Sequence, residues 1–251
     1  MTGGAVILTA LAVWGIERRV TATPSDDRPM PLRQGLAEVW AEPQARDFTL
    51  FIFLSMVAYF LQELILEPYA GLVFGMTPGQ STQLSGVQHG GVFLGMLTVG
   101  IACTGLRLGS LRAWVMGGCV LSALALGFIA WLGLVGMDLM RPATFALGVG
   151  NGVFAVAAIG AMMALAGQGR QAREGTRMGL WGAAQALAAG FGGLLGAASA
   201  DALRLVMADA PAFATVFLAE AFLFLVAALM AAQVVAGGAQ RAQSQAVMAG
   251  E

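Results

Sequence analysis

Residues 59–96 read YFLQELILEPYAGLVFGMTPGQSTQLSGVQHGGVFLGM, and the rest of the chain follows the pattern set there. Two apolar segments meet at a short polar turn, residues 76–83. The first segment carries Glu63 and Glu67, and the second carries His89, the sole histidine of the sequence. Ionisable side chains inside apolar segments are costly in a bilayer, so these three mark candidate functional positions.

The composition is that of an integral membrane protein. Hydrophobic residues make up 58% of the 251 residues and charged residues 11%, whereas soluble domains average about 45–50% and about 25%. Apolar runs of the length that an α-helix needs to cross a hydrocarbon core recur along the chain. The lipid bilayer is therefore an expected partner. A net charge of −1 gives no reason to expect nucleic acid.

Motifs that carry catalysis are absent from the sequence. There is no zinc-ligand spacing, P-loop, HExxH or GxSxG motif. Cys103 and Cys119 lie in or near apolar segments, which favours packing over a disulfide or a metal site. We therefore expect a protein that is not an enzyme and binds no free metal ion.

Six long apolar segments predict an all-α bundle of six transmembrane helices over residues 48–236. We place them near 48–74, 81–105, 112–133, 142–166, 177–200 and 211–236. The loops between them are short, which predicts that sequential helices are antiparallel neighbours.

The flanking regions differ in composition from this membrane domain. Residues 1–19 hold a short apolar run and a charged stop, which predicts a partial transmembrane helix and a longer protein beginning upstream. Residues 20–47 predict a cytoplasmic linker, in which Leu32, Leu36, Val39 and Trp40 form one face of an interfacial amphipathic helix. Residues 237–251 predict a cytoplasmic tail.

Arginines indicate the orientation of the bundle. If the linker is cytoplasmic, all arginines except Arg141 and Arg204 fall on the cytoplasmic side. Cytoplasmic loops are enriched in basic residues, so this bias predicts a multi-pass protein whose C-terminus is cytoplasmic.

Glycines four residues apart recur in the apolar segments. Small residues at this spacing allow helix backbones to approach closely in lipid. We therefore predict helix packing at these pairs: Gly71/Gly75, Gly86/Gly90, Gly91/Gly95, Gly148/Gly152 and Gly192/Gly196.

Four polar residues fall near the membrane midplane on these boundaries. At about 1.5 Å of rise per residue, they are His89, Asn151, Gln185 and Glu220. Asn151 and Gln185 are predicted to bond neighbouring helices. No basic residue lies at the depth of Glu220, which predicts a carboxyl that holds a proton or pairs with a group from elsewhere.

Glu63 and Glu67 lie higher in the membrane and share one helix face. Two carboxylates this close disfavour double ionisation. The pair therefore predicts a proton or cation site, a ligand contact, or a hydrogen-bonded pair that fixes a helix contact beside Pro68. His89 has three interpretations: a bond across helices, a titrating group, or a metal ligand.

Two motifs give the chain a family resemblance. Residues 64–84, LILEPYAGLVFGMTPGQSTQL, and residues 175–193, GTRMGLWGAAQALAAGFGG, resemble signatures of the PucC-type proteins of phototrophic bacteria. These are light-harvesting complex assembly factors, also called the bacteriochlorophyll delivery family, within the major facilitator superfamily. Residues 106–112 keep Arg107, Gly109 and Arg112 of that superfamily's loop motif, without its aspartate.

The resemblance implies the C-terminal half of a major facilitator fold, preceded by part of one helix. It also implies a bacterial inner, intracytoplasmic photosynthetic membrane. The expected cofactor is bacteriochlorophyll or a precursor. The expected partners are light-harvesting antenna polypeptides, together with a missing N-terminal half or a second copy of the chain.

Candidate ligand contacts on this interpretation are Glu63, Glu67, Tyr69, His89 and Gln185. The carboxylates would bond polar groups of the macrocycle, and His89 would be an axial ligand of chlorin magnesium. Two alternatives stay open. One is a proton-coupled secondary transporter of a small solute that uses Glu63 or Glu220 as its proton site. The other is a membrane scaffold that binds antenna polypeptides but no pigment.

Overall fold

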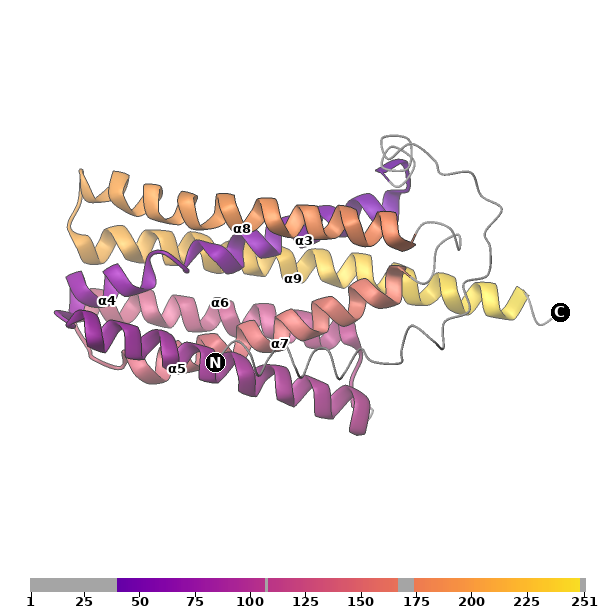
Figure 1. The fold of residues 1–251 in the computed structure, drawn as a ribbon, viewed down its shortest axis with the longest axis horizontal. Helices are drawn as coiled ribbons and strands as arrows, with labels where there is room; N and C mark the ends of the chain where they lie inside the picture. Colours follow the sequence, from indigo (N-terminus) through magenta and orange to yellow (C-terminus); the bar gives the residue numbers. More distant parts are fainter. Residues whose placement is uncertain (1–39, 107, 167–173, 249–251) are drawn as a thin grey trace, which may run out of the picture. The chain divides into compact units, whose positions relative to one another are not determined.

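Helices make up nearly all of the chain that the structure, a computed structural model, describes: residues 40–106, 108–166 and 174–248 (Figure 1). The helices are α3 (Pro43–Leu61), α4 (Leu66–Phe74), α5 (Pro78–Gly100), a π-helical turn η1 (Ile101–Gly105), α6 (Leu111–Val135), α7 (Met140–Ala166), α8 (Glu174–Arg204) and α9 (Asp209–Met248). The predicted partial helix 1–19 lies outside the described residues, as does most of the predicted linker 20–47.

Six of the described helical segments are long and apolar enough to cross a membrane. They are Pro43–Phe74, Pro78–Cys103, Leu111–Val135, Met140–Ala166, Gly175–Arg204 and Asp209–Val234. The all-α class and the six predicted spans are therefore confirmed, and the described ranges contain no strand. The major facilitator arrangement stays a prediction.

The first span is a broken helix, which the sequence analysis did not predict. α3 ends at Leu61 and α4 begins at Leu66, and the residues between them form turns with bonds from Glu63 N to Phe60 O and from Ile65 N to Gln62 O, both 3.1 Å. Pro68 has no N–H group to donate, and its ring crowds the carbonyl of the residue four positions earlier. The break places Glu63 in the turn and Glu67 in α4, so the prediction that the two share one continuous helix face is wrong.

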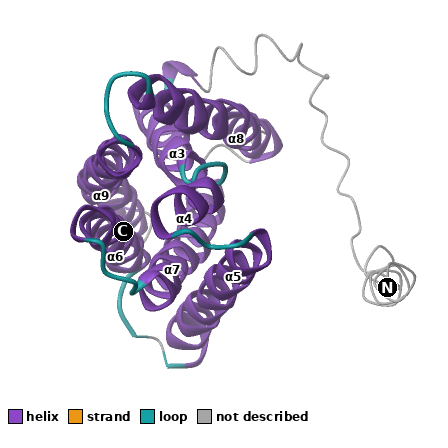
Figure 2. Cartoon of the chain, turned by 90° about the vertical axis from the view of Figure 1, so that its left-hand side faces the viewer, coloured by secondary structure: helices purple, strands orange, loops and turns teal. Residues whose placement is uncertain are grey.

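The prediction of sequential neighbours holds closely for α6 and α7 and fails for α5 and α6, while the other sequential pairs touch less extensively than pairs further apart in sequence. α5 packs mainly on α7, α7 on α6, α6 on α9, and α3 on both α9 and α8. Seen end on, α8 and α5 lie at opposite ends of this row (Figure 2). Short loops limit the distance between helix ends, but the shapes of the helix faces decide which helices pack together.

Glycines explain two of these contacts. A Cβ atom added to Gly148 would lie 2.1 Å from the carbonyl oxygen of Gln88, and one at Gly152 would lie 2.1 Å from that of Val92. These positions bring the α7 backbone directly against α5. On α8, a Cβ atom at Gly196 would lie 2.1 Å from the carbonyl oxygen of Leu61 in α3.

The other predicted glycines differ in whether they contact another helix. Gly91 and Gly95 face α7, and Gly192 faces α3. A Cβ atom at Gly86 or Gly90 would meet no described atom within 4 Å, so these two face open space. The first pair packs no helix closely: Gly71 makes an ordinary contact with Met76, and Gly75 ends α4 in a left-handed conformation with φ of 65°.

The two helices at the ends of the row are the most open. In the most apolar window of each span, 28% of the residues are buried in α5 and in α8, against 50–67% in the other four. The candidate residues on α5 and α8 therefore lie on faces that the described chain leaves uncovered.

Candidate functional site

Glu67 and His89 are brought together by Ser85, where α4 packs on α5. The Ser85 hydroxyl donates to Glu67 Oε1 at 2.7 Å, and His89 Nδ1 lies 2.7 Å from the backbone carbonyl oxygen of Ser85. Glu67 and His89 are both exposed. Sequence reasoning missed Ser85, although it lies four residues before His89 and therefore on the same helix face.

The contact between His89 and Ser85 assigns the imidazole tautomer. A carbonyl oxygen can only accept a hydrogen bond, so the proton of a neutral ring lies on Nδ1. Nε2 then carries a lone pair. Histidines that bind metals usually donate the other ring N–H to a carbonyl or carboxylate in this way. His89 therefore has the donor chemistry of an axial metal ligand.

The residues beside His89 on α5 include two glycines with no described atom packed against them. Gly86 lies one turn before His89 and Gly90 directly after it, and no described atom comes within 4 Å of a Cβ built at either position. Phe93, one turn further along α5, is 68% exposed and provides an apolar surface beside the imidazole. A flat, apolar ring system could approach this face without displacing a side chain.

The remaining predicted contacts do not join this group. Glu63 is exposed at the α3–α4 break, and Gln185 is half-buried on α8, which packs on α3. Tyr69 is buried in the core, where its hydroxyl donates to the carbonyl oxygen of Ile129 at 2.7 Å. Its ring packs on Phe217, with ring centroids 4.9 Å apart. Tyr69 therefore packs in the core and does not reach the group formed by Glu67, Ser85 and His89.

A second polar group lies deep in the bundle. Glu220 is fully buried, and neither carboxyl oxygen has a hydrogen-bond partner among the described residues. One turn before it, Phe217 packs on Tyr69. One turn after it, Phe224 packs on Phe154, with centroids 6.1 Å apart. Glu220 therefore lies between two aromatic contacts in the core.

Asn151 lies at the same depth as Glu220. It precedes Phe154 by one turn on α7, a helix that runs in the same direction as α9. Its Oδ1 accepts a 2.8 Å bond from the hydroxyl of Ser122 on α6, which confirms the predicted bond to a neighbouring helix. Its Nδ2 has no acceptor among the described residues.

In the part of the chain that the structure describes, no three His, Cys, Asp or Glu side chains come together as a metal site. The lone Nε2 of His89 suits a metal whose other ligands come from a macrocycle.

Comparisons with known proteins identify the family of the chain. The model of the PUCC protein family matches residues 1–239, and the chain belongs to that family. It is 65% identical over 252 residues to the protein named "Bacteriochlorophyll synthase 44.5 kDa chain" of Rhodobacter capsulatus, covering 100% of this chain and 58% of that protein.

More distant relatives carry the family's name. The chain is 29% identical over 236 residues to "Protein PucC" of Cereibacter sphaeroides, covering 87% of this chain and 48% of that protein. The chain thus spans about half the length of the curated relatives it matches. No solved structure matches it.

Proposed function

We propose that this chain is a light-harvesting antenna assembly factor of a photosynthetic membrane that handles bacteriochlorophyll or a precursor. The observation that carries the proposal is the orientation of His89. Its Nδ1 proton bonds the Ser85 carbonyl, which leaves the Nε2 lone pair available on an exposed residue with Gly86 one turn before it and Gly90 directly after it. Family membership and the printed name of the 65% identical relative supply the pigment class.

Each residue of the group has a stated task in this proposal. His89 Nε2 would hold the chlorin magnesium, which would act as a Lewis acid toward the imidazole. Ser85 holds Glu67 through its hydroxyl and His89 through its carbonyl oxygen. Glu67 keeps one carboxyl oxygen for a polar substituent of the ring. Glu63 and Gln185 lie apart from this group and are candidates for a second contact.

The role is non-enzymatic in our proposal. The word synthase belongs to the name of a relative. The Ser85 hydroxyl donates to Glu67, whereas His89 bonds the backbone carbonyl of Ser85 and not its hydroxyl, so we assign these residues to holding a ligand. The residues of the candidate site can hold and orient a pigment, and the open faces of α5 and α8 can cover an antenna helix during its transfer.

The first experiment is an absorption spectrum of the chain purified in mild detergent from a phototrophic host. We expect near-stoichiometric bacteriochlorophyll with the wild-type chain and its loss with His89→Ala. Ser81→Ala is the matched control, because Ser81 lies one turn before Ser85 on α5 and bonds a carbonyl of its own helix. A folded, colourless wild-type protein would overturn the proposal, as would a His89→Ala variant that keeps its pigment.

A second candidate function is supported by Glu220 alone. A fully buried carboxyl group without a hydrogen-bond partner is a feature of proton-coupled transporters of small solutes. Proton-dependent uptake into proteoliposomes that is lost with Glu220→Gln or Glu63→Gln would favour it. Co-purification with antenna polypeptides but without pigment would instead favour a scaffold.

We further propose that the C-terminus is cytoplasmic, as the arginine distribution predicts. Labelling of a single cysteine placed at position 241 by a membrane-impermeant reagent tests this. We expect labelling in inside-out vesicles and protection in intact cells.

A further inference from the structure

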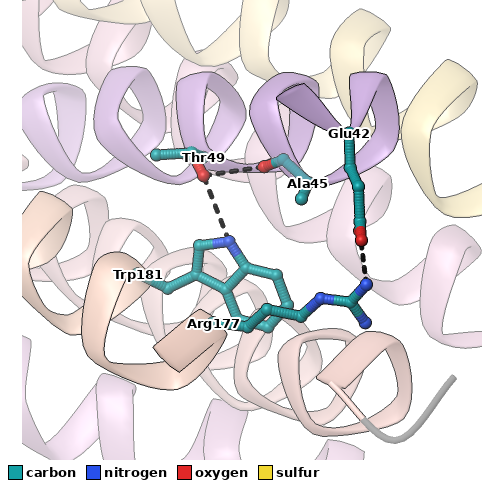
Figure 3. A network of polar contacts seen from close by, with 5 residues as sticks. All are labelled: Glu42, Ala45, Thr49, Arg177 and Trp181. Carbon is teal, nitrogen blue, oxygen red and sulfur yellow. Dashed lines mark hydrogen bonds and ion pairs between the residues drawn. The ribbon is translucent and has the colours of Figure 1, made fainter. Parts of the chain in front are cut away.

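A polar cluster ties α3 to α8 at the end of the bundle where both helices begin (Figure 3). Arg177 Nη2 forms an ion pair with a carboxylate oxygen of Glu42. One turn further along α8, Trp181 Nε1 donates to Thr49 Oγ1 at 3.2 Å, and that hydroxyl donates to the carbonyl oxygen of Ala45 at 2.7 Å. The cluster is separate from the His89 group and has no part in the function proposed above.

Arg177 is the unusual member of this cluster. It is 8% exposed, and its Nε–H group has no acceptor among the described residues. A buried donor without a partner is costly, and the cost is greater for a charged group. The guanidinium therefore has room for an acceptor that the described chain does not supply.

A cavity lies directly beside this guanidinium. Its volume is about 50 Å³, and it is lined by Glu42, Gln44, Ala45, Phe48, Leu165, Arg177 and Trp181. This exceeds the roughly 10–15 Å³ that one water molecule needs. It is far too small for a tetrapyrrole, so it suits a compact polar group.

The start of α3 gives the same cavity a second set of donors. Pro43 begins the helix and Arg46 N bonds the carbonyl oxygen of Glu42, so the amide groups of Gln44 and Ala45 have no acceptor within the helix. The N-terminal end of a helix also carries partial positive charge. Gln44 and Ala45 line the cavity together with Arg177, and a helix N-terminus beside a guanidinium favours an anionic acceptor.

The cavity also lies at a membrane interface. The spans that frame it begin at Pro43 and Gly175, so it sits at the level of lipid headgroups. We propose that this cavity binds a phosphate group, held by Arg177 Nε and by the first amides of α3.

The carboxylate of Glu42 competes with a bound phosphate for Arg177, so the proposal predicts the direction in which a Glu42 substitution changes the affinity for phosphate. This carboxylate neutralises Arg177 at the mouth of the cavity, and the Glu42 side chain is 38% exposed. A bound phosphate must share the guanidinium with this carboxylate. Removing the carboxylate charge is therefore expected to strengthen phosphate binding, although it weakens the α3–α8 ion pair.

The test uses the full chain purified in detergent, with thermal unfolding followed during titration. The three titrants are phosphatidylglycerol, phosphatidylcholine and inorganic phosphate. We expect a saturable rise in Tm that Arg177→Gln shifts to about 10- to 100-fold higher ligand concentration. Glu42→Gln should shift it roughly two- to fivefold lower. Arg46→Gln is the control, because Arg46 lies in the same helical turn and is 46% exposed.

The titrants distinguish the source of the phosphate. Saturation by phosphatidylglycerol alone identifies a lipid headgroup, and saturation by inorganic phosphate identifies a free anion. A rise in Tm that Arg177→Gln leaves unchanged, or that Arg46→Gln reduces equally, overturns the site. If Arg177→Gln does not fold, Glu42→Gln decides, and an unchanged midpoint in that variant overturns the proposal.

Discussion

Some polar side chains in the core are buried without a hydrogen-bond partner among the described residues, which costs free energy of folding. Glu220 is the clearest case. Burying a polar group without a hydrogen bond costs about 1–3 kcal/mol in protein mutational data. Glu220→Met has similar length and no polar atoms. We expect it to raise the free energy of unfolding by about 1–3 kcal/mol, measured by thermal unfolding in detergent.

The control for that substitution is Glu67→Met. Glu67 is exposed and accepts a bond from Ser85, so its replacement relieves no buried group. Equal stabilisation by both substitutions would mean that general hydrophobicity, and not the buried carboxyl of Glu220, is responsible.

Trp181 offers a second test on the scale of one residue. It is 1% exposed, packs edge-on against Phe48 with ring centroids 4.8 Å apart, and donates to Thr49. Trp181→Phe should lower the free energy of unfolding by about 1–3 kcal/mol, because it removes one hydrogen bond and leaves unfilled volume. Trp131→Phe should have little effect, since Trp131 is 47% exposed. A larger loss at Trp131 would contradict this assignment.

The sequence was sufficient to identify the polar residues that are costly to bury in the membrane, but not the residues that form hydrogen bonds with them. Asn151 and Glu220 are recognisable because an amide or a carboxyl group in an apolar run must be accounted for. Serine carries no such signal, so the roles of Ser85 and Ser122 emerge only when helices far apart in sequence are placed together. Tyr69 lies in a family motif, yet it serves the core, because its hydroxyl can bond a carbonyl of α6 while its ring stays buried.

Helix contacts depend on single glycines, and this can be tested on α7. A Cβ atom at Gly152 would lie 2.1 Å from the Val92 carbonyl oxygen, so Gly152→Ala must push α5 away from α7. We expect a loss of about 1–3 kcal/mol or more in unfolding free energy. Gly117→Ala is the matched control, because no described atom lies within 4 Å of a Cβ there. Alanine is the better helix former, so the control should be neutral or stabilised.

The hydropathy pattern predicted where the membrane-spanning helices lie, but not which helices pack against each other. All six spans follow from runs of apolar residues, because the bilayer imposes length and composition on each helix. The break at residues 62–65 leaves hydropathy unchanged, so it is not visible in that signal. The pairing of α5 with α7 depends on which glycines face each other. A four-residue spacing of glycines predicts a close helix contact, but it does not predict which helix packs there.

The molecule as a whole leaves its two outermost helices open. We infer that a second copy of the chain packs on α8, so that the His89 face of α5 stays free for the proposed ligand. Leu194 on α8 and Leu124 on α6 are 66% and 67% exposed, so they are a matched pair. With Cys103 and Cys119 replaced by alanine, Leu194→Cys should form cross-linked dimers in membranes and Leu124→Cys should not. Equal cross-linking at both positions would contradict a specific contact through α8.

The row of helices also fixes an order of events during synthesis. α3 packs on α8 and α9, and α8 begins more than a hundred residues after α3 ends. At roughly 5–20 residues per second, the ribosome needs about 6–20 s to supply that partner. Until then, the face of α3 that carries Val57, Phe60 and Leu61 lacks its partner on α8. Nascent chains of this protein are therefore expected to depend on the insertion machinery, or on a membrane chaperone, until the fifth span has been made.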